Sequence, residues 1–177
     1  PCSLNEIAKR NVELGYYDKS FFAVYSPEEI FQMDSYIRHD RDENIAFAGM
    51  EQFRGKYLVQ NRVTGAIYET PQIAYMMISA TLFANYSPKI RLKYVKDFYD
   101  AISNFDISLP TPIMAGLRTP QRQFSSCVLI ETDDSLDSIN ATSSAIVKYV
   151  SQKAGIGIGA GSIRAINSPI RNGDASH

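Results

Sequence analysis

The chain of 177 residues is long enough for one ordinary domain or for part of a larger protein. Apolar residues make up 45% of it, enough for a core, and 18 Lys and Arg nearly balance 19 Asp and Glu. The net charge of −1 provides no basic surface for DNA or RNA. No apolar run is long enough to cross a membrane, and two distant cysteines form no disulfide framework, so the cytoplasm is the expected compartment.

The first hundred residues carry several helix-start signals. Ser26-Pro27-Glu28-Glu29 combines a capping serine, a first-turn proline and an acidic third residue. Thr70-Pro71 and Ser87-Pro88 repeat the cap followed by proline and are expected to begin an antiparallel helix pair. Apolar spacing favours one earlier helix, which ends at Gly15. The predicted helices span residues 4–14, 27–37, 71–85 and 88–103.

Two short β-prone runs, residues 56–60 and 66–69, flank the turn-forming residues 61–65. This pattern predicts a β-hairpin. The mixed charges of residues 39–43 are typical of a solvated turn or a helix end.

Residues 109–127, LPTPIMAGLRTPQRQFSSC, are the most informative stretch of the chain. Proline fixes φ and removes a backbone donor, so its three prolines predict a stiff, extended wall. Hydroxyls beside a thiol suit a site that holds a polar ligand next to redox or nucleophilic chemistry. We expect the wall to bring together Thr111, Ser125, Ser126 and Cys127.

The character of the chain changes near residue 105. Residues 127–130 are an apolar run typical of a buried strand, and Asp134 is expected to cap a helix over 135–153. Residues 155–161 are either β-like or a close backbone approach. The order predicts a mixed α+β class. Residues 1–105 form an α-helical region with a β-hairpin, and residues 106–177 begin an α/β sheet or barrel with a strand–helix–strand unit.

Cys127 has two interpretations. A free cysteine in a strand is commonly a small buried hydrophobe. Ser125 and Ser126 beside it favour instead a reactive thiol, and the residues alone leave both open. Cys2 has no such neighbours and is interpreted as incidental.

Three charged residues follow the strand at places suited to anions. Asp134 either caps the helix or lies where a helix N-terminus binds nucleotide groups. Arg164 and Arg171 lie in a segment rich in Ser, Asn and Gly, and either bind phosphates or face solvent. His39 and His177 have no partner at metal-ligand spacing, so no metal site is predicted.

Several phrases of the chain resemble those of one enzyme family and follow one another in the family's order. From Ser108 onward they are SLPTPIMAGLRTPQRQFSSCVLIE, DSLDSINATSSAIVKYVSQKAGIGI and IRAINSPIRNG. Earlier phrases are AKRNVELGYYD, GKYLVQNRVTGAIYETPQ and RLKYVKDFYDAIS. Together they cover nearly the whole chain, which resembles the large (alpha) subunit of class Ia ribonucleotide reductase.

The resemblance implies a helical region leading into the first strand–helix–strand unit of a ten-stranded α/β barrel. It implies radical reduction of ribonucleoside diphosphates to 2′-deoxyribonucleoside diphosphates for DNA replication. No cofactor is expected in this chain, because a di-iron-tyrosyl small subunit would supply the radical. Thioredoxin or glutaredoxin would act as the reductant.

Site residues follow from the same resemblance. Thr111, Ser126 and Cys127 match positions that bind the substrate diphosphate and take part in reduction, with Cys127 as half of a redox-active disulfide pair. The helix over 135–153 would pack in a large-subunit homodimer, whose interface holds the effector site. The residues expected to bind the dNTP or ATP effectors there are Asp134, Ser135, Leu136, Arg164 and Arg171.

Some positions depart from the family pattern. Ser162 lies where the resemblance implies an arginine that could contact the effector, and Gly159 also differs. Asn167 replaces a glycine but tolerates the positive φ that glycine permits. The chain begins with Pro1, and the radical cysteine would lie beyond His177, so we expect a piece that is inactive alone. The alternative is a non-catalytic piece of a split reductase that acts as an assembly or nucleotide-binding module.

Overall fold

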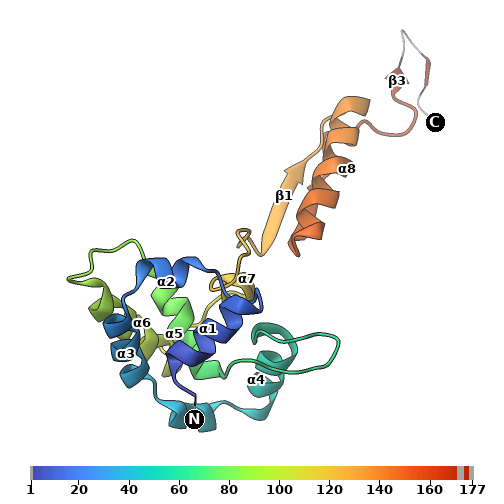
Figure 1. Cartoon of the computed structure of the whole chain (residues 1–177). Helices are drawn as coiled ribbons and strands as arrows, with labels where there is room; N and C mark the ends of the chain where they lie inside the picture. The colour runs from blue at the N-terminus through green and yellow to red at the C-terminus, as the bar shows by residue number, and fades with distance from the viewer. Residues whose placement is uncertain (1, 171–173, 176–177) are drawn as a thin grey trace. The chain divides into compact units, whose positions relative to one another are not determined.

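The computed structural model describes residues 2–170 and 174–175 (Figure 1). The chain forms two compact units, Pro1–Phe124 and Ser125–His177. The first is helical and the second combines strands with a helix, as the predicted fold class requires. The units divide later than residue 105 because the segment that follows this residue packs into the first unit through a short helix.

Helices in the first unit begin where side-chain caps are available. α1 (Leu4–Glu13) and α3 (Pro27–Tyr36) each begin with a capping box formed by a serine and a glutamate. α5 (Pro71–Leu82) begins at Thr70, whose hydroxyl accepts a hydrogen bond from a backbone N–H. These three predicted helices are confirmed. The other elements are α2 (Ser20–Val24), the 3₁₀ helix η1 (His39–Asn44), α4 (Phe47–Gln52), the π-helical turn η2 (Phe53–Tyr57), α6 (Arg91–Ser103) and α7 (Thr111–Gly116).

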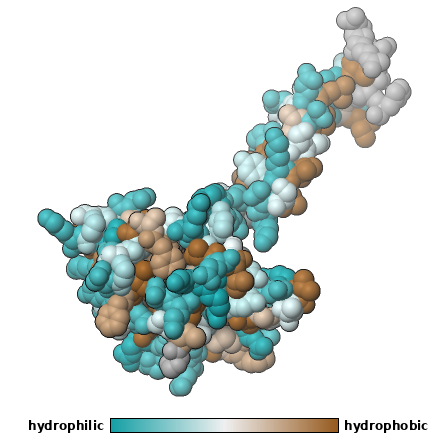
Figure 2. All heavy atoms as spheres, viewed as in Figure 1, coloured by the Kyte–Doolittle hydropathy of each residue, from teal (hydrophilic) through white to brown (hydrophobic). Residues whose placement is uncertain are grey.

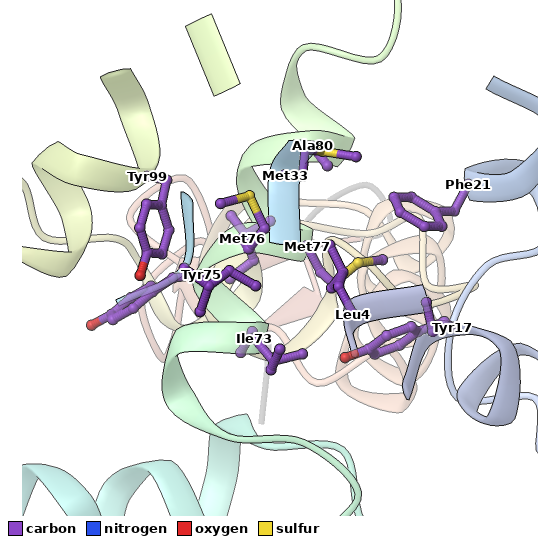
Figure 3. Packing of buried hydrophobic residues seen from close by; sticks show 14 of the residues in the cluster. Leu4, Tyr17, Phe21, Met33, Ile73, Tyr75, Met76, Met77, Ala80 and Tyr99 are labelled. Atoms are coloured by element: carbon purple, nitrogen blue, oxygen red, sulfur yellow. The ribbon is translucent and has the colours of Figure 1, made fainter. Parts of the chain in front are cut away.

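α5 is the centre of the core. All its residues from Pro71 to Ala80 are buried, as expected of a helix that is enclosed on every side. Methionines and aromatic rings fill the space between α5 and its neighbours (Figure 3). Core residues contributed from outside α5 include Leu4, Tyr17, Phe21, Met33 and Tyr99.

α5 and α6 form the predicted antiparallel pair. The hydroxyl of Tyr99, late in α6, donates to Gln72 early in α5 at 2.7 Å. At the opposite ends, Phe83 stacks on Tyr94 with ring centroids 5.7 Å apart. Each helix therefore contacts the other with its direction reversed.

The expected beginning of the second helix at Ser87-Pro88 is wrong. The N–H groups of Ile90 and Arg91 both donate to the Ser87 carbonyl at 2.9 Å, so a turn precedes α6. Arg91 is buried, and its guanidinium donates to Glu29 at 2.7 and 2.8 Å. This ion pair, between residues far apart in the sequence, anchors the first residue of the helix. The residues next to Arg91 in the sequence do not predict it.

The predicted hairpin is present in a reduced form. The Gly65 N–H donates to the Asn61 carbonyl at 2.8 Å, which closes the turn. Antiparallel pairing is limited to Gln60 and Ile67. Residues 56 and 57 belong to η2, which places the ring of Phe53 in the core.

The proline-rich run is not extended throughout, and the prediction of a continuous wall is wrong. Residues 111–116 form α7. Pro112 lies in the first turn of α7, where the missing N–H has no intrahelical acceptor to lose. Residues 117–126 contain no helix or strand.

The second unit begins with the predicted strand–helix–strand. β1 (Cys127–Glu131) leads into α8 (Leu136–Ser151), which returns to β2 (Gly155–Gly159). The two strands pair in parallel, as a helical crossover allows. β3 (Pro169–Ile170) and β4 (Asp174–Ala175) pair antiparallel. Arg171 and His177 lie outside the described residues.

Candidate functional site

Cys127 is exposed at the first position of β1. Exposure alternates along this strand, with Leu129 exposed on the same face as Cys127 and Val128 half-buried on the other. α8 contacts both strands. The expectation of a buried strand is therefore wrong, and so is the interpretation of Cys127 as a buried hydrophobe.

Glycines of β2 let the exposed side chains of β1 lie close against the backbone of β2. Cys127 pairs with Gly155, and a Cβ atom at Gly155 would lie 3.4 Å from the Cys127 sulfur. At Gly157 it would lie 2.6 Å from Leu129, closer than real Cβ atoms come. Gly159 is similarly constrained by a carboxylate of β1. The sequence left open whether this glycine-rich segment is a strand or a close backbone approach. β2 is a strand whose glycines lie close to the side chains of β1, so both descriptions apply.

The polar residues predicted around the thiol belong to both units. Ser126 is exposed directly before Cys127, and its carbonyl accepts the Gly155 N–H at 2.9 Å. Ser125 precedes it at the beginning of the second unit. Thr111 is exposed as the first residue of α7 in the first unit. The structure thus places a hydroxyl beside the thiol on one short segment.

The turn between β1 and α8 holds the predicted effector residues. Ser135 caps α8, because its hydroxyl accepts the Ser138 N–H at 3.1 Å. Leu136, the first residue of the helix, is exposed. The expected capping role of Asp134 is wrong, since Ser135 lies directly before the helix and satisfies the N–H that a cap reaches.

Asp134 binds Arg164 instead. One carboxylate oxygen of Asp134 accepts the Arg164 Nε–H at 2.6 Å, and the other accepts the Arg164 backbone N–H at 3.2 Å. Arg164 also donates to the Pro169 carbonyl at 3.3 Å. Each charged side chain stays about one-third exposed. The pair places a guanidinium close to the N-terminal turn of α8, where the helix dipole also favours anions.

Asn167 takes the backbone conformation expected of its position. Its φ of 71° lies in the left-handed region, which asparagine tolerates. Replacement of the expected glycine at this position therefore preserves the turn.

The described residues provide neither a metal site nor a membrane span. Among residues 2–170 and 174–175, no group of His, Cys, Asp or Glu is arranged to hold a metal ion. Within the same residues, every helix is too short or too polar to cross a membrane.

One buried charge pair was not predicted. Arg118 and Glu69 are both fully buried and form an ion pair. They lie 49 positions apart, so no local pattern connects them. Arg118 lies in the proline-rich run, between Thr111 and Cys127 in the sequence.

Comparison with known proteins accounts for both units. The all-alpha domain of ribonucleotide reductase matches residues 43–122, and its barrel domain matches residues 125–177. The two matches meet where the compact units divide. The chain belongs to the ribonucleotide reductase family. It comprises helical residues of the large subunit followed by the start of its barrel, which confirms the resemblance and the predicted fold class.

Similarity to curated members of the family extends along the whole chain. The chain is 62% identical over 177 residues to ribonucleoside-diphosphate reductase 1 subunit alpha of Escherichia coli K12, covering 100% of this chain and 23% of the relative. The subunit alpha of Enterobacteria phage T4 is 52% identical over 166 residues, covering 94% of this chain and 22% of the relative. That of Treponema pallidum is 29% identical over 159 residues, covering 90% and 19%. The chain therefore spans about a quarter or less of these relatives.

Proposed function

We propose that this chain is part of a ribonucleoside-diphosphate reductase large subunit and carries one reducing cysteine. The observation that carries the proposal is the exposed thiol of Cys127, beside the Ser126 hydroxyl, on a strand face lined by glycines. An exposed thiol is accessible to a sugar, and a buried cysteine is not. Relatives named ribonucleoside-diphosphate reductase supply the reaction class.

In this proposal Cys127 supplies reducing equivalents. The C2′–OH bond of the ribose breaks and a C2′–H bond forms, with the oxygen leaving as water. Two thiols lose two electrons and two protons and form a disulfide, which balances the reaction. One thiol is Cys127, and the other belongs to the remainder of the large subunit. A di-iron-tyrosyl small subunit supplies the radical, and thioredoxin or glutaredoxin reduces the disulfide.

In this proposal the hydroxyl groups of Ser126 and Thr111 bind the substrate. Ser126 lies beside the thiol, and Thr111 is exposed at the beginning of α7. Neutral hydroxyls donate hydrogen bonds to phosphate oxygens without forming a fixed ion pair. The proposal keeps the predicted division of the chain at residue 105. All proposed substrate- and effector-binding residues lie after this position.

Effector binding belongs to the turn before α8. The Arg164 guanidinium suits the triphosphate of a deoxynucleotide or ATP, and Asp134, Ser135 and Leu136 suit its sugar and base. Arg171 completes the proposed set outside the described residues. Exposed apolar residues of α8, such as Val147, suit a homodimer interface at this site. Figure 2 shows hydrophobic surface among the hydrophilic atoms of the second unit.

The substitution Cys127→Ser in the complete large subunit tests the proposal. Turnover with the small subunit and thioredoxin should fall by roughly 10³-fold or more, as when a covalent catalytic group is removed. The dissociation constant of the ribonucleoside diphosphate should change little, because serine is close to cysteine in size and its hydroxyl replaces the thiol. Cys2→Ser is the matched control and should retain wild-type turnover. Unchanged turnover of the Cys127 variant would contradict the proposal.

A further inference from the structure

A buried ion pair ties the proline-rich run to the helical core. The side chains of Arg118 and Glu69 are fully buried. Arg118 Nε donates to both carboxylate oxygens of Glu69 at 2.9 and 3.1 Å, and Nη2 binds the same carboxylate. This carboxylate also accepts the Val59 N–H at 2.8 Å and the hydroxyl of Tyr17. Burial and the neighbouring Glu69 carboxylate raise the pKa of Tyr17, so its hydroxyl stays protonated as a donor.

The same guanidinium holds the C-terminal half of α7. Arg118 Nη1 donates to the Met114 carbonyl at 2.7 Å, and Nη2 donates to the Tyr57 carbonyl at 2.9 Å. The Arg118 carbonyl accepts the Asp18 N–H at 2.9 Å. A cation beside the last carbonyls of a helix is favoured by the helix dipole. Through its side chain and its backbone carbonyl, Arg118 thus connects α7 to the segments that contain Tyr57, Glu69 and Asp18.

Stability alone is a weak explanation for charge at this position. Apolar side chains of similar volume often replace a buried ion pair with no loss of stability. The planar fork of arginine adds geometric definition, because its donors point in fixed directions at several acceptors. Glu69 and Arg118 therefore fix the direction and the position of α7 more closely than apolar packing would.

We infer that Arg118 and Glu69 are positioning residues that hold Thr111, a proposed substrate-binding residue, at a fixed place within the first unit. α7 has six residues and is about 9 Å long, so an anchor at its C-terminal half sets the place of its first residue. Thr111, that first residue, is exposed. The inference rests on the proposed function, in which the Thr111 hydroxyl binds the substrate diphosphate.

A double-mutant cycle in the complete large subunit, assayed with the small subunit, tests this role. Thr111→Val should raise KM for the ribonucleoside diphosphate by roughly 10-fold, because a hydrogen bond to a charged group is lost. Arg118→Lys should also raise KM, with kcat nearly unchanged. Lysine keeps the charge and cannot contact Glu69, Met114 and Tyr57 together. In the double variant, KM should match that of Thr111→Val alone, since both changes remove the same contact.

Arg122→Lys is the matched control. Arg122 lies in the same segment, and its side chain is mostly exposed in an ion pair with Asp18, so KM should stay at the wild-type value. If Arg118→Lys does not yield folded subunit, Glu69→Gln replaces it in the same cycle, because glutamine keeps the shape of the acceptor.

The measurements distinguish failure of the positioning role from failure of the proposed function. The positioning role is overturned if KM of the Arg118 or Glu69 variant equals that of wild type, or if its effect multiplies with that of Thr111→Val. The proposed function fails separately if Thr111→Val leaves KM unchanged or if the wild-type subunit reduces no ribonucleotide.

Discussion

Removal of the Arg91 side chain should destabilise the helical unit strongly. Arg91 and Glu29 side chains are only 8% and 15% exposed. The guanidinium contacts both carboxylate oxygens, donates to the Val24 carbonyl at 2.7 Å and lies over the Tyr25 ring at 4.6 Å. Arg91→Ala leaves the carboxylate without its charge partner. The free energy of unfolding should fall by about 3–5 kcal/mol, the usual cost of breaking a buried pair from one side.

Urea denaturation of the 177-residue chain, followed by far-ultraviolet circular dichroism, measures this loss. With a slope of roughly 1–3 kcal/mol/M, the unfolding midpoint should fall by about 1–5 M. Lys93→Ala on the same helix is the control. Its ion pair with Asp97 is largely exposed, so the expected loss is below about 1 kcal/mol. Equal losses in the two variants would refute the reasoning from burial.

The dependence of this loss on pH checks its electrostatic origin. Hydrogen bonding from the Arg91 guanidinium holds the pKa of Glu29 below its ordinary value of 4.5. A lowered folded-state pKa stabilises the fold above pH 4.5, and the contribution disappears as the pH falls through the folded-state value. The difference between wild type and Arg91→Ala should therefore be largest above pH 4.5 and shrink in acid. A difference that does not change with pH would indicate lost packing instead.

Two further predictions concern other carboxylates. Hydrogen bonds from Ser20, with the Arg122 guanidinium adding to them, lower the pKa of Asp18 from 3.8 to about 2. Ionised Asp18 therefore stabilises the fold above pH 3.8, and wild type loses this contribution as the pH falls to about 2. Asp18→Asn should lack the contribution, so its stability should fall less over this pH range. Acid unfolding curves measure the difference, and superimposable curves would contradict the assignment. Asp134→Ala in the complete large subunit should weaken deoxynucleotide effector binding by roughly 10-fold, because the Arg164 guanidinium loses the carboxylate that orients it. Calorimetric titration with the effector measures this change, and an unchanged dissociation constant would remove Asp134 from the site.

Local signals made part of the fold predictable. Ser26 and Thr70 cap helices through residues three positions away, so the beginnings of α3 and α5 are visible in a short window. The beginning of α6 depends on the contact between Arg91 and Glu29, which lie 62 positions apart. A short stretch of sequence cannot include both residues. α7 was missed because prolines exclude helix interiors but not first turns.

The candidate site shows the same limit. The sequence places Ser126 beside Cys127 by adjacency, and the thiol's importance follows from this pairing. Its exposure depends on which face of β1 the rest of the unit packs against, and residue types do not reveal this. Asp134 was correctly placed at a helix N-terminus, but its partner Arg164 is 30 positions away. A side chain that can bind either a helix end or a distant cation is settled only by the fold.

Alkylation of Cys127 across a single turnover tests the central claim most directly. The complete large subunit is reduced, freed of reductant, and mixed with its small subunit, substrate and effector. Iodoacetamide labelling and mass spectrometry then follow Cys127. We expect the exposed thiol to be labelled before turnover and protected afterwards in a disulfide, in proportion to the deoxyribonucleotide formed. Product formation with Cys127 still fully available for labelling would contradict its role as a reductant.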